Sequence, residues 1–206
     1  MPTTQFETLL TKLLDDGVRS SPPMPPPVWY IATEQFSPQR GQTWHDYVAW
    51  SQLPQLTELV TLDHVLCPPI IDPPAPEDWA HNVNADFLIA FFVSLEHVLR
   101  RMGGRSNVNV LAVMREPSEA DCAGFQAPGF TMTGFDLVEK PGLGISALTN
   151  CGGFPLAFAN SALTNNGLLP TLALARAAQK KLREHYPAEP HADCHVWAIW
   201  RLATGH

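Results

Sequence analysis

The stretch Cys194-His-Val-Trp-Ala-Ile-Trp-Arg-Leu202 decides the fold class of this 206-residue chain. Its apolar, β-branched and aromatic residues follow one another over a length that is typical of a strand. Successive side chains of a strand point to opposite faces, so Val196 and Trp200 share one face and Trp197 lies on the other. The sequence therefore predicts a strand over 194–202, and the segments before it indicate what kind of sheet this strand joins.

One helix is predicted directly before that strand and another at the start of the chain. Residues 171–186 have helical spacing, and Pro187 ends that helix. Near the N-terminus, Thr4 and Glu7 fit a capping box, and Gly17 suits the left-handed position after a helix. The apolar residues between them share one helical face: Phe6, Leu9, Leu10, Leu13 and Leu14.

Several other segments have the composition of strands or helices. Strands are predicted over 28–32, 58–62 and 109–114, and a short helix after Thr43. Segments 131–139 and 144–149 flank the turn Lys140-Pro-Gly-Leu143 and predict a hairpin.

Residues 84–104 allow two interpretations. Apolar residues at helical spacing favour one helix that ends at Gly103 and Gly104. The run 87–93 could instead be a buried strand, followed by a shorter helix that Ser94 caps. We favour the single helix.

These segments follow no regular strand–helix–strand alternation, and no glycine-rich turn of the dinucleotide-binding kind is present. The sequence therefore predicts an α+β fold, with a mainly antiparallel sheet packed by about three helices in a single domain over 1–206. Residues 20–27 are rich in proline and predict an extended strut, or alternatively a ligand for an aromatic groove. Residues 67–83 are expected to form a proline-rich loop.

The charge and composition exclude some classes of protein. The net charge is −7 with only 13 lysine and arginine residues, so nucleic-acid binding and docking on anionic membranes are not expected. No apolar stretch is long enough for a membrane span, and the N-terminus does not resemble a signal peptide. We expect a cytoplasmic protein in which the four cysteines are thiols.

The most reactive pattern in the sequence is Asn150-Cys151-Gly152-Gly153. A thiolate at Cys151 could act as a nucleophile, and the glycine amides could stabilise an oxyanion. The base would be a histidine elsewhere in the chain, either His195 or His191, with Asp193 orienting it. The alternative is a structural cysteine in a loop.

A second pattern contains metal-ligand residue types. The pair His64 and Cys67 has the same spacing as His191 and Cys194, and together they could supply four ligands to zinc. Against this hypothesis, neither pair has the Cys-x-x-Cys form of structural zinc sites. No other cofactor is expected.

Aromatic residues gather in the first part of the chain, where they could form a binding surface or part of the core. The candidates for binding are Trp29, Tyr30, Trp44, Tyr47 and Trp50. Together with the acidic charge they favour a non-catalytic protein that binds another, basic protein, as an inhibitor or an immunity protein does. A cysteine-dependent hydrolase or transferase built on Cys151 is the alternative, and a metal-binding protein the second alternative.

Overall fold

The computed structural model describes residues 27–72, 75–82, 91–139, 144–150 and 152–203. The predicted N-terminal helix lies outside these residues. The proline-rich segment 20–27 also lies outside them, except for Pro27, and so does Cys151.

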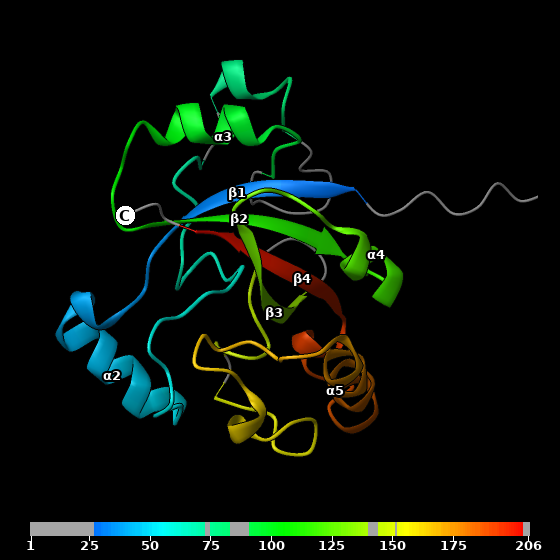
Figure 1. Cartoon of the computed structure of the whole chain (residues 1–206). Coiled ribbons are helices and arrows are strands. Elements are labelled where there is room, and N and C mark those ends of the chain that lie inside the picture. The colour runs from blue at the N-terminus through cyan, green and yellow to red at the C-terminus, as the bar shows by residue number, and fades with distance from the viewer. Residues whose placement is uncertain (1–26, 73–74, 83–90, 140–143, 151, 204–206) are drawn as a thin grey trace, which may run out of the picture.

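Four strands form one antiparallel sheet (Figure 1). They are β1 (Val28–Glu34), β2 (Val108–Arg115), β3 (Phe130–Glu139) and β4 (Cys194–Leu202). The strand order is β1-β2-β4-β3, and each neighbouring pair is antiparallel. The prediction of an α+β fold with an antiparallel sheet is confirmed, and β4 has the predicted bounds.

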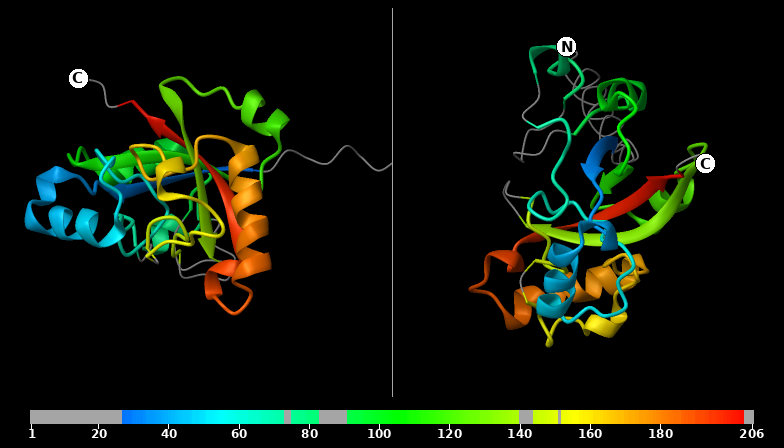
Figure 2. Two further views of the ribbon diagram at one scale, coloured as in Figure 1. Left: turned by 90° about the horizontal axis from the view of Figure 1, so that it is seen from below. Right: turned by 90° about the vertical axis from the view of Figure 1, so that its left-hand side faces the viewer.

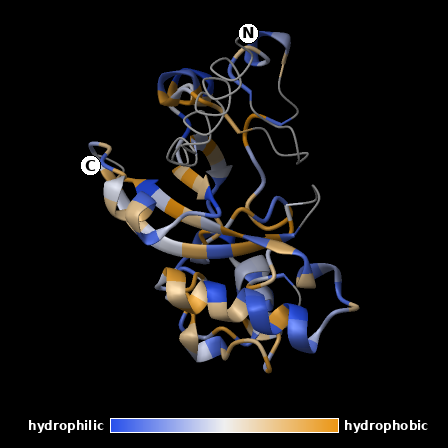
Figure 3. Ribbon diagram, turned by 90° about the vertical axis from the view of Figure 1, so that its right-hand side faces the viewer, coloured by the Kyte–Doolittle hydropathy of each residue, from blue (hydrophilic) through white to orange (hydrophobic). Residues whose placement is uncertain are grey.

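In the described part of the chain, four α-helices accompany the sheet: α2 (Gln42–Ser51), α3 (Leu95–Met102), α4 (Glu119–Gly124) and α5 (Leu172–His185). The helices α3 and α5 lie at opposite ends of the molecule with the sheet between them (Figures 1 and 2). Figure 3 shows hydrophilic and hydrophobic residues side by side along α5, as in an amphipathic helix. Within the described ranges, no helix has the length and apolar character needed to cross a membrane.

Helix α5 confirms the prediction for 171–186. The Thr171 side chain caps the helix by accepting a hydrogen bond from the backbone amide of Leu174. The residues predicted to face inward are buried against the sheet: Leu172, Ala175, Ala178 and Leu182. The helix after Thr43 is also present as α2, although it begins at Gln42.

The single helix favoured over 84–104 is wrong for the described part of that segment. Helix α3 begins only at Leu95, and the Ser94 side chain caps it by accepting from the amide of His97. The chain before it is extended, because the backbone of Phe92 exchanges two hydrogen bonds with Tyr30 of β1 at 2.8 and 2.9 Å. Pairing with a strand edge satisfies the backbone groups there and outweighs the helical spacing.

Two predicted strands are absent and one helix is additional. Residues 58–62 and 144–149 are not strands, and each forms one isolated bridge, Leu59 with Phe36 and Ser146 with Val138. The short helix α4 was not predicted, although the reciprocal hydrogen bonds of Ser118 and Asp121 form a capping box at its start. In these places local composition did not determine the pairing.

Candidate functional site

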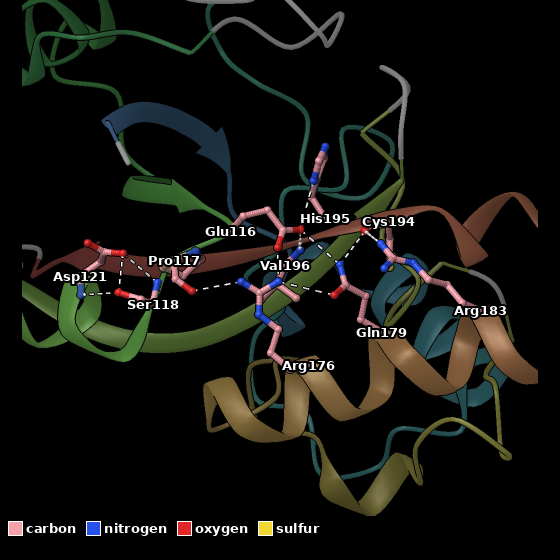
Figure 4. A network of polar contacts seen from close by, with 10 residues as sticks. All are labelled: Glu116, Pro117, Ser118, Asp121, Arg176, Gln179, Arg183, Cys194, His195 and Val196. Atoms are coloured by element: carbon pink, nitrogen blue, oxygen red, sulfur yellow. Dashed lines mark hydrogen bonds and ion pairs between the residues drawn. The ribbon is translucent and has the colours of Figure 1, made fainter. Parts of the chain in front are cut away.

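Glu116 lies where β2 ends, and it organises a network of polar contacts (Figure 4). Its φ angle is 52°, in the left-handed region that non-glycine residues rarely adopt. The carboxylate Oε1 accepts from the amide of Val196 at 3.0 Å and lies 3.1 Å from Nδ1 of His195. From α5, Arg176 donates to Oε2 and Gln179 donates to Oε1. Glu116 therefore joins β2, β4 and α5.

The hydrogen bonds around Glu116 change its acidity. Partial burial alone would raise its pKa, but hydrogen bonds from His195, Arg176 and Val196, with the charge of Arg176, outweigh burial and lower the pKa to about 2. The carboxylate is thus ionised at neutral pH and orients the His195 ring. Sequence reasoning identified His195 but missed Glu116, and the positive φ that marks it is not readable from composition.

We expect Glu116→Gln to lower the free energy of unfolding at pH 7 by about 1–2 kcal/mol, because the neutral amide cannot accept from all these donors. The folded pKa lies below the unfolded value of about 4.3, so the ionised carboxylate stabilises the protein above pH 4.3. That contribution is lost as the pH falls through about 2. The side chain is 34% exposed, so screening keeps the effect modest.

Urea unfolding at pH 7, 4 and 3 measures the effect, and the difference between wild type and variant should shrink as the pH falls. Glu184→Gln is the matched control, because Glu184 forms only an exposed ion pair with Lys180. Equal stability of wild type and Glu116→Gln at all three pH values would contradict this account of the network.

His191, one of the two histidines predicted as a base for Cys151, contacts Phe154 and Glu139. Phe154, which follows the two glycines, packs its ring 5.5 Å from the His191 ring. Nδ1 of His191 lies 3.4 Å from the carboxylate of Glu139, with both side chains largely buried. That contact is an ion pair only while His191 is protonated, and its geometry is not that of a hydrogen bond. Cys151 itself is not described, so its role as a nucleophile stays a prediction.

The three described cysteines are poor nucleophiles. Burial raises the pKa of Cys67 far above its ordinary value, raises that of Cys194 to about 12 and that of Cys122 to about 11. Thiols with such pKa values are protonated at neutral pH and react slowly. Reactive thiol chemistry is not supported at any of these three positions.

The four proposed zinc ligands are not brought together. His64 is near Gly144, Cys67 is buried, and its thiol donates to the carbonyl of Leu59. His191 faces Glu139, whereas Cys194 is buried in the sheet. Among the residues that the structure describes, no group of three or more histidine, cysteine or acidic side chains could hold a metal ion.

The predicted aromatic surface lies mostly in the core. Trp44 and Tyr47 are buried beside Phe36, with ring centroids 5.7 and 5.2 Å from it. Trp29 and Tyr30 are half-buried, and of the five candidates only Trp50 is largely exposed, at 53%. Helical spacing on α2 turns two of these rings inward, which composition alone did not show.

Four open clefts adjoin one another around one end of the sheet, where β1 and β4 finish and β2 and β3 begin. Their volumes are about 310, 300, 470 and 600 Å³. The first two share Gln35 and residues 105–108, the second and third share Leu202 and Ala203, and the last two share Thr131 and Met132. We call this surface the cleft band.

Hydrogen bonds between side chains link two residues that line the cleft band, Gln35 and Arg201, through Asn109 and Glu58. The amide of buried Asn109 donates to Glu58 at 3.0 Å, and Arg201 donates to the other oxygen of Glu58 at 2.7 Å. Gln35 lies at the outer end of this network, 3.5 Å from the Asn109 side-chain oxygen. The network joins the ends of β1, β2 and β4, so it fixes the relative positions of these strand ends beside the band.

Comparisons with protein-family models, with curated proteins and with solved structures find no match to this chain.

Proposed function

We propose that the protein is a non-catalytic binding protein that holds a segment of a partner protein along the cleft band. The row of adjoining clefts supports this proposal, because an extended polypeptide needs a long, open surface. Small-molecule sites are instead usually single concave pockets that enclose most of the ligand.

The chemistry of the described residues supports binding more than catalysis. The described thiols have raised pKa values, and His195 is held by a carboxylate that also accepts from Arg176, Gln179 and a backbone amide. Such a fully engaged carboxylate serves the packing of α5 on the sheet. The cleft band itself combines apolar side chains such as Leu99 and Met102 with hydroxyl and amide groups, as protein-binding surfaces do.

The net charge of −7 overstates the acidity of the surface that a partner would meet, because part of the acidic charge is buried. Among the described residues, four acidic side chains are buried, namely Asp63, Asp78, Asp136 and Glu139, and so they contribute little to the surface that a partner meets. The basic partner that the net charge favours, and the cytoplasmic location, stay predictions within this proposal.

Site-specific photo-crosslinking tests the proposal. A photoreactive residue at Ser106 or at Gln126, both exposed on the band, should crosslink a discrete partner in cells, because each position lines a cleft. The same residue at Ser161 or Ala173, exposed but outside the band, is the matched control and should not. Equal labelling at all four positions, or none at the band, would overturn the proposal.

The alternative, a hydrolase or transferase that uses Cys151, makes a different prediction. Site-resolved alkylation of the native protein should then modify Cys151 much faster than Cys67, Cys122 and Cys194. His191→Ala should slow that reaction, because His191 contacts Phe154, three residues after Cys151 in the sequence. Equal, slow alkylation of all four thiols would contradict the hydrolase or transferase hypothesis and leave the binding function.

A further inference from the structure

The outer edge of β3 is paired along most of its length. Phe135 exchanges two backbone hydrogen bonds with Leu169, at 2.9 and 3.0 Å. Further along, the carbonyl of Leu137 accepts from Ala147, and the amide of Glu139 donates to Ile145. These segments cover the edge from Phe135 onward, as stable sheets usually require.

The start of β3 is different, because the outward backbone groups of Met132 are open, although the amide of Phe130 donates to Ala127. The amide of Ala203 donates to the carbonyl of Gly129 at 2.7 Å. This bond shows which residue pairs between β3 and β4 exchange hydrogen bonds and which do not, because the two kinds of pair alternate along the strands. In an antiparallel ladder, Thr131 then faces Arg201 in a hydrogen-bonded pair, and the N–H and C=O of Met132 point away from β4. Within the described part of the chain, no backbone hydrogen bond is found on this outward side of Met132.

Two clefts that differ in the residues lining them flank this open edge. On the face that Met132 shares with Trp200, the lining of the cleft of about 600 Å³ includes the rings of Phe125, Phe130 and buried Trp200 beside the polar Gln126 and Thr131. We call it the aromatic cleft. On the other face, the cleft of about 470 Å³ is lined by polar residues: Thr131, Thr133, Thr164, Asn165, Asn166 and Arg201. Met132 borders both clefts and is 37% exposed.

We propose that the partner binds by strand addition at Met132, as a short extended segment whose side chains alternate between apolar and polar. This inference rests on the proposed binding function and specifies its mode. The partner's backbone pairs with the N–H and C=O of Met132, which supplies affinity. Because successive side chains of a strand point to opposite faces, an apolar side chain enters the aromatic cleft and its neighbour enters the polar cleft.

The fold limits the length of this added strand. Leu169 already occupies the edge at Phe135, and a bulge between Met132 and Gly134 bends β3 just before it. The added segment therefore pairs over only two or three residues and then leaves the edge. This mode differs from long edge-to-edge pairing between two copies of the chain, which would need an uninterrupted open strand.

Two substitutions of Met132 separate the contribution of its backbone N–H to binding from that of its side chain. Met132→Pro removes the outward N–H but breaks no bond to β4, and proline is tolerated where a strand's N–H faces outward. Met132→Ala truncates the side chain and keeps the N–H. Heptapeptides enriched from a random display library on the immobilised full chain are the probe, and fluorescence anisotropy measures their affinity for each variant.

We expect the enriched peptides to alternate apolar and polar residues and to bind Met132→Pro at least tenfold more weakly than Met132→Ala. Both variants should melt within a few degrees of the wild type. Equal affinity of the two variants, or enriched peptides that neither variant affects, would overturn strand addition, whereas crosslinking at Ser106 or Gln126 would still support the binding function. A dimer of wild type that Met132→Pro dissociates would identify a second copy as the occupant and overturn the proposal.

Discussion

Replacing Asp136 by asparagine is expected to lower the free energy of unfolding by about 3 kcal/mol, since the change breaks a fully buried hydrogen-bond network and leaves a buried backbone N–H without an acceptor. Oδ2 of Asp136 accepts from the hydroxyl of Thr61 at 2.7 Å and from the amide of Leu62 at 3.0 Å. Oδ1 accepts from the hydroxyl of Ser146 at 2.5 Å and from the amide of Leu137 at 2.8 Å. An asparagine NH₂ at either place faces a backbone N–H and leaves it without an acceptor.

The buried neighbour Asp63 extends this hydrogen-bond network to two loops, residues 61–66 and 146–150. Its Oδ1 accepts from the amides of Val65 and Leu66, and its Oδ2 from the amide of Ser146 and the side chain of Asn150. The two carboxylates thus hold residues 61–66 and 146–150 against β3. Loss of one carboxylate should loosen both loops together.

The same substitution changes how stability depends on pH. Burial raises the pKa of Asp136, hydrogen bonds from Ser146 and Thr61 oppose the rise, and the charge of Asp63 adds to it. A raised carboxyl pKa means that the stabilisation is complete below the unfolded value of about 3.9 and is lost as the pH rises through the folded pKa. The stability difference between wild type and Asp136→Asn should therefore narrow, without disappearing, from pH 4 to pH 7.

Chemical unfolding followed by tryptophan fluorescence measures both effects. Asp46→Asn is the matched control, because Asp46 is exposed and accepts only from Gln42 on the same helix. The control should change the free energy of unfolding by less than about 0.5 kcal/mol. A loss below about 1 kcal/mol for Asp136→Asn would mean that the hydroxyl groups and loops rearrange to accommodate an amide.

Replacing Gly134 by alanine is expected to cost about 3 kcal/mol or more, because strain and a clash act together. Gly134 sits at the bulge of β3 with a φ angle of 147°, which side chains rarely adopt. A Cβ at this position would lie 2.8 Å from the Cβ of Leu168 and 2.8 Å from the carbonyl oxygen of Leu169. Relief would require the segment that pairs with Phe135 to move outward.

Thermal and urea unfolding measure this loss, and Gly124→Ala is the matched control. Gly124 lies at the end of α4, and an added Cβ would have open space. The control should be neutral or slightly stabilising, since alanine favours helix more than glycine. If Gly134→Ala were as stable as the control, the close approach of 168–169 to β3 would be wrong, and so would the limit set on the added strand.

The sequence was sufficient to predict a helix or strand where a local pattern of apolar residues coincided with burial in the folded protein. The helical face over 171–186 survives in α5 because the helix buries the side that its period defines, and the apolar run over 194–202 survives in β4 because both faces of that strand are buried from Val196 to Trp200. Segment 58–62 shows the limit. Its apolar residues are buried as expected, but their backbone bonds go to Phe36, Asn165 and Asn166, which local composition cannot reveal.

The candidate site was less predictable than the fold. His195 could be singled out from the sequence, but its partner Glu116 lies 79 residues away, at the end of a different strand. The aromatic residues were singled out for binding, but α2 directs Trp44 and Tyr47 into the core. Glycine and capping patterns near Ser118 were present in the sequence and could have identified α4.

The sequence alone therefore determined the class of fold, the central strand, the last helix and the acidic balance, because period, capping and charge are local or additive properties. Only the tertiary structure decided that four acidic residues are buried, that Glu116 joins β2 to α5, and that the edge of β3 is open at Met132 but closed at Phe135. Each of these depends on which distant backbone or side-chain groups satisfy one another, and that pairing is fixed only when the chain is packed.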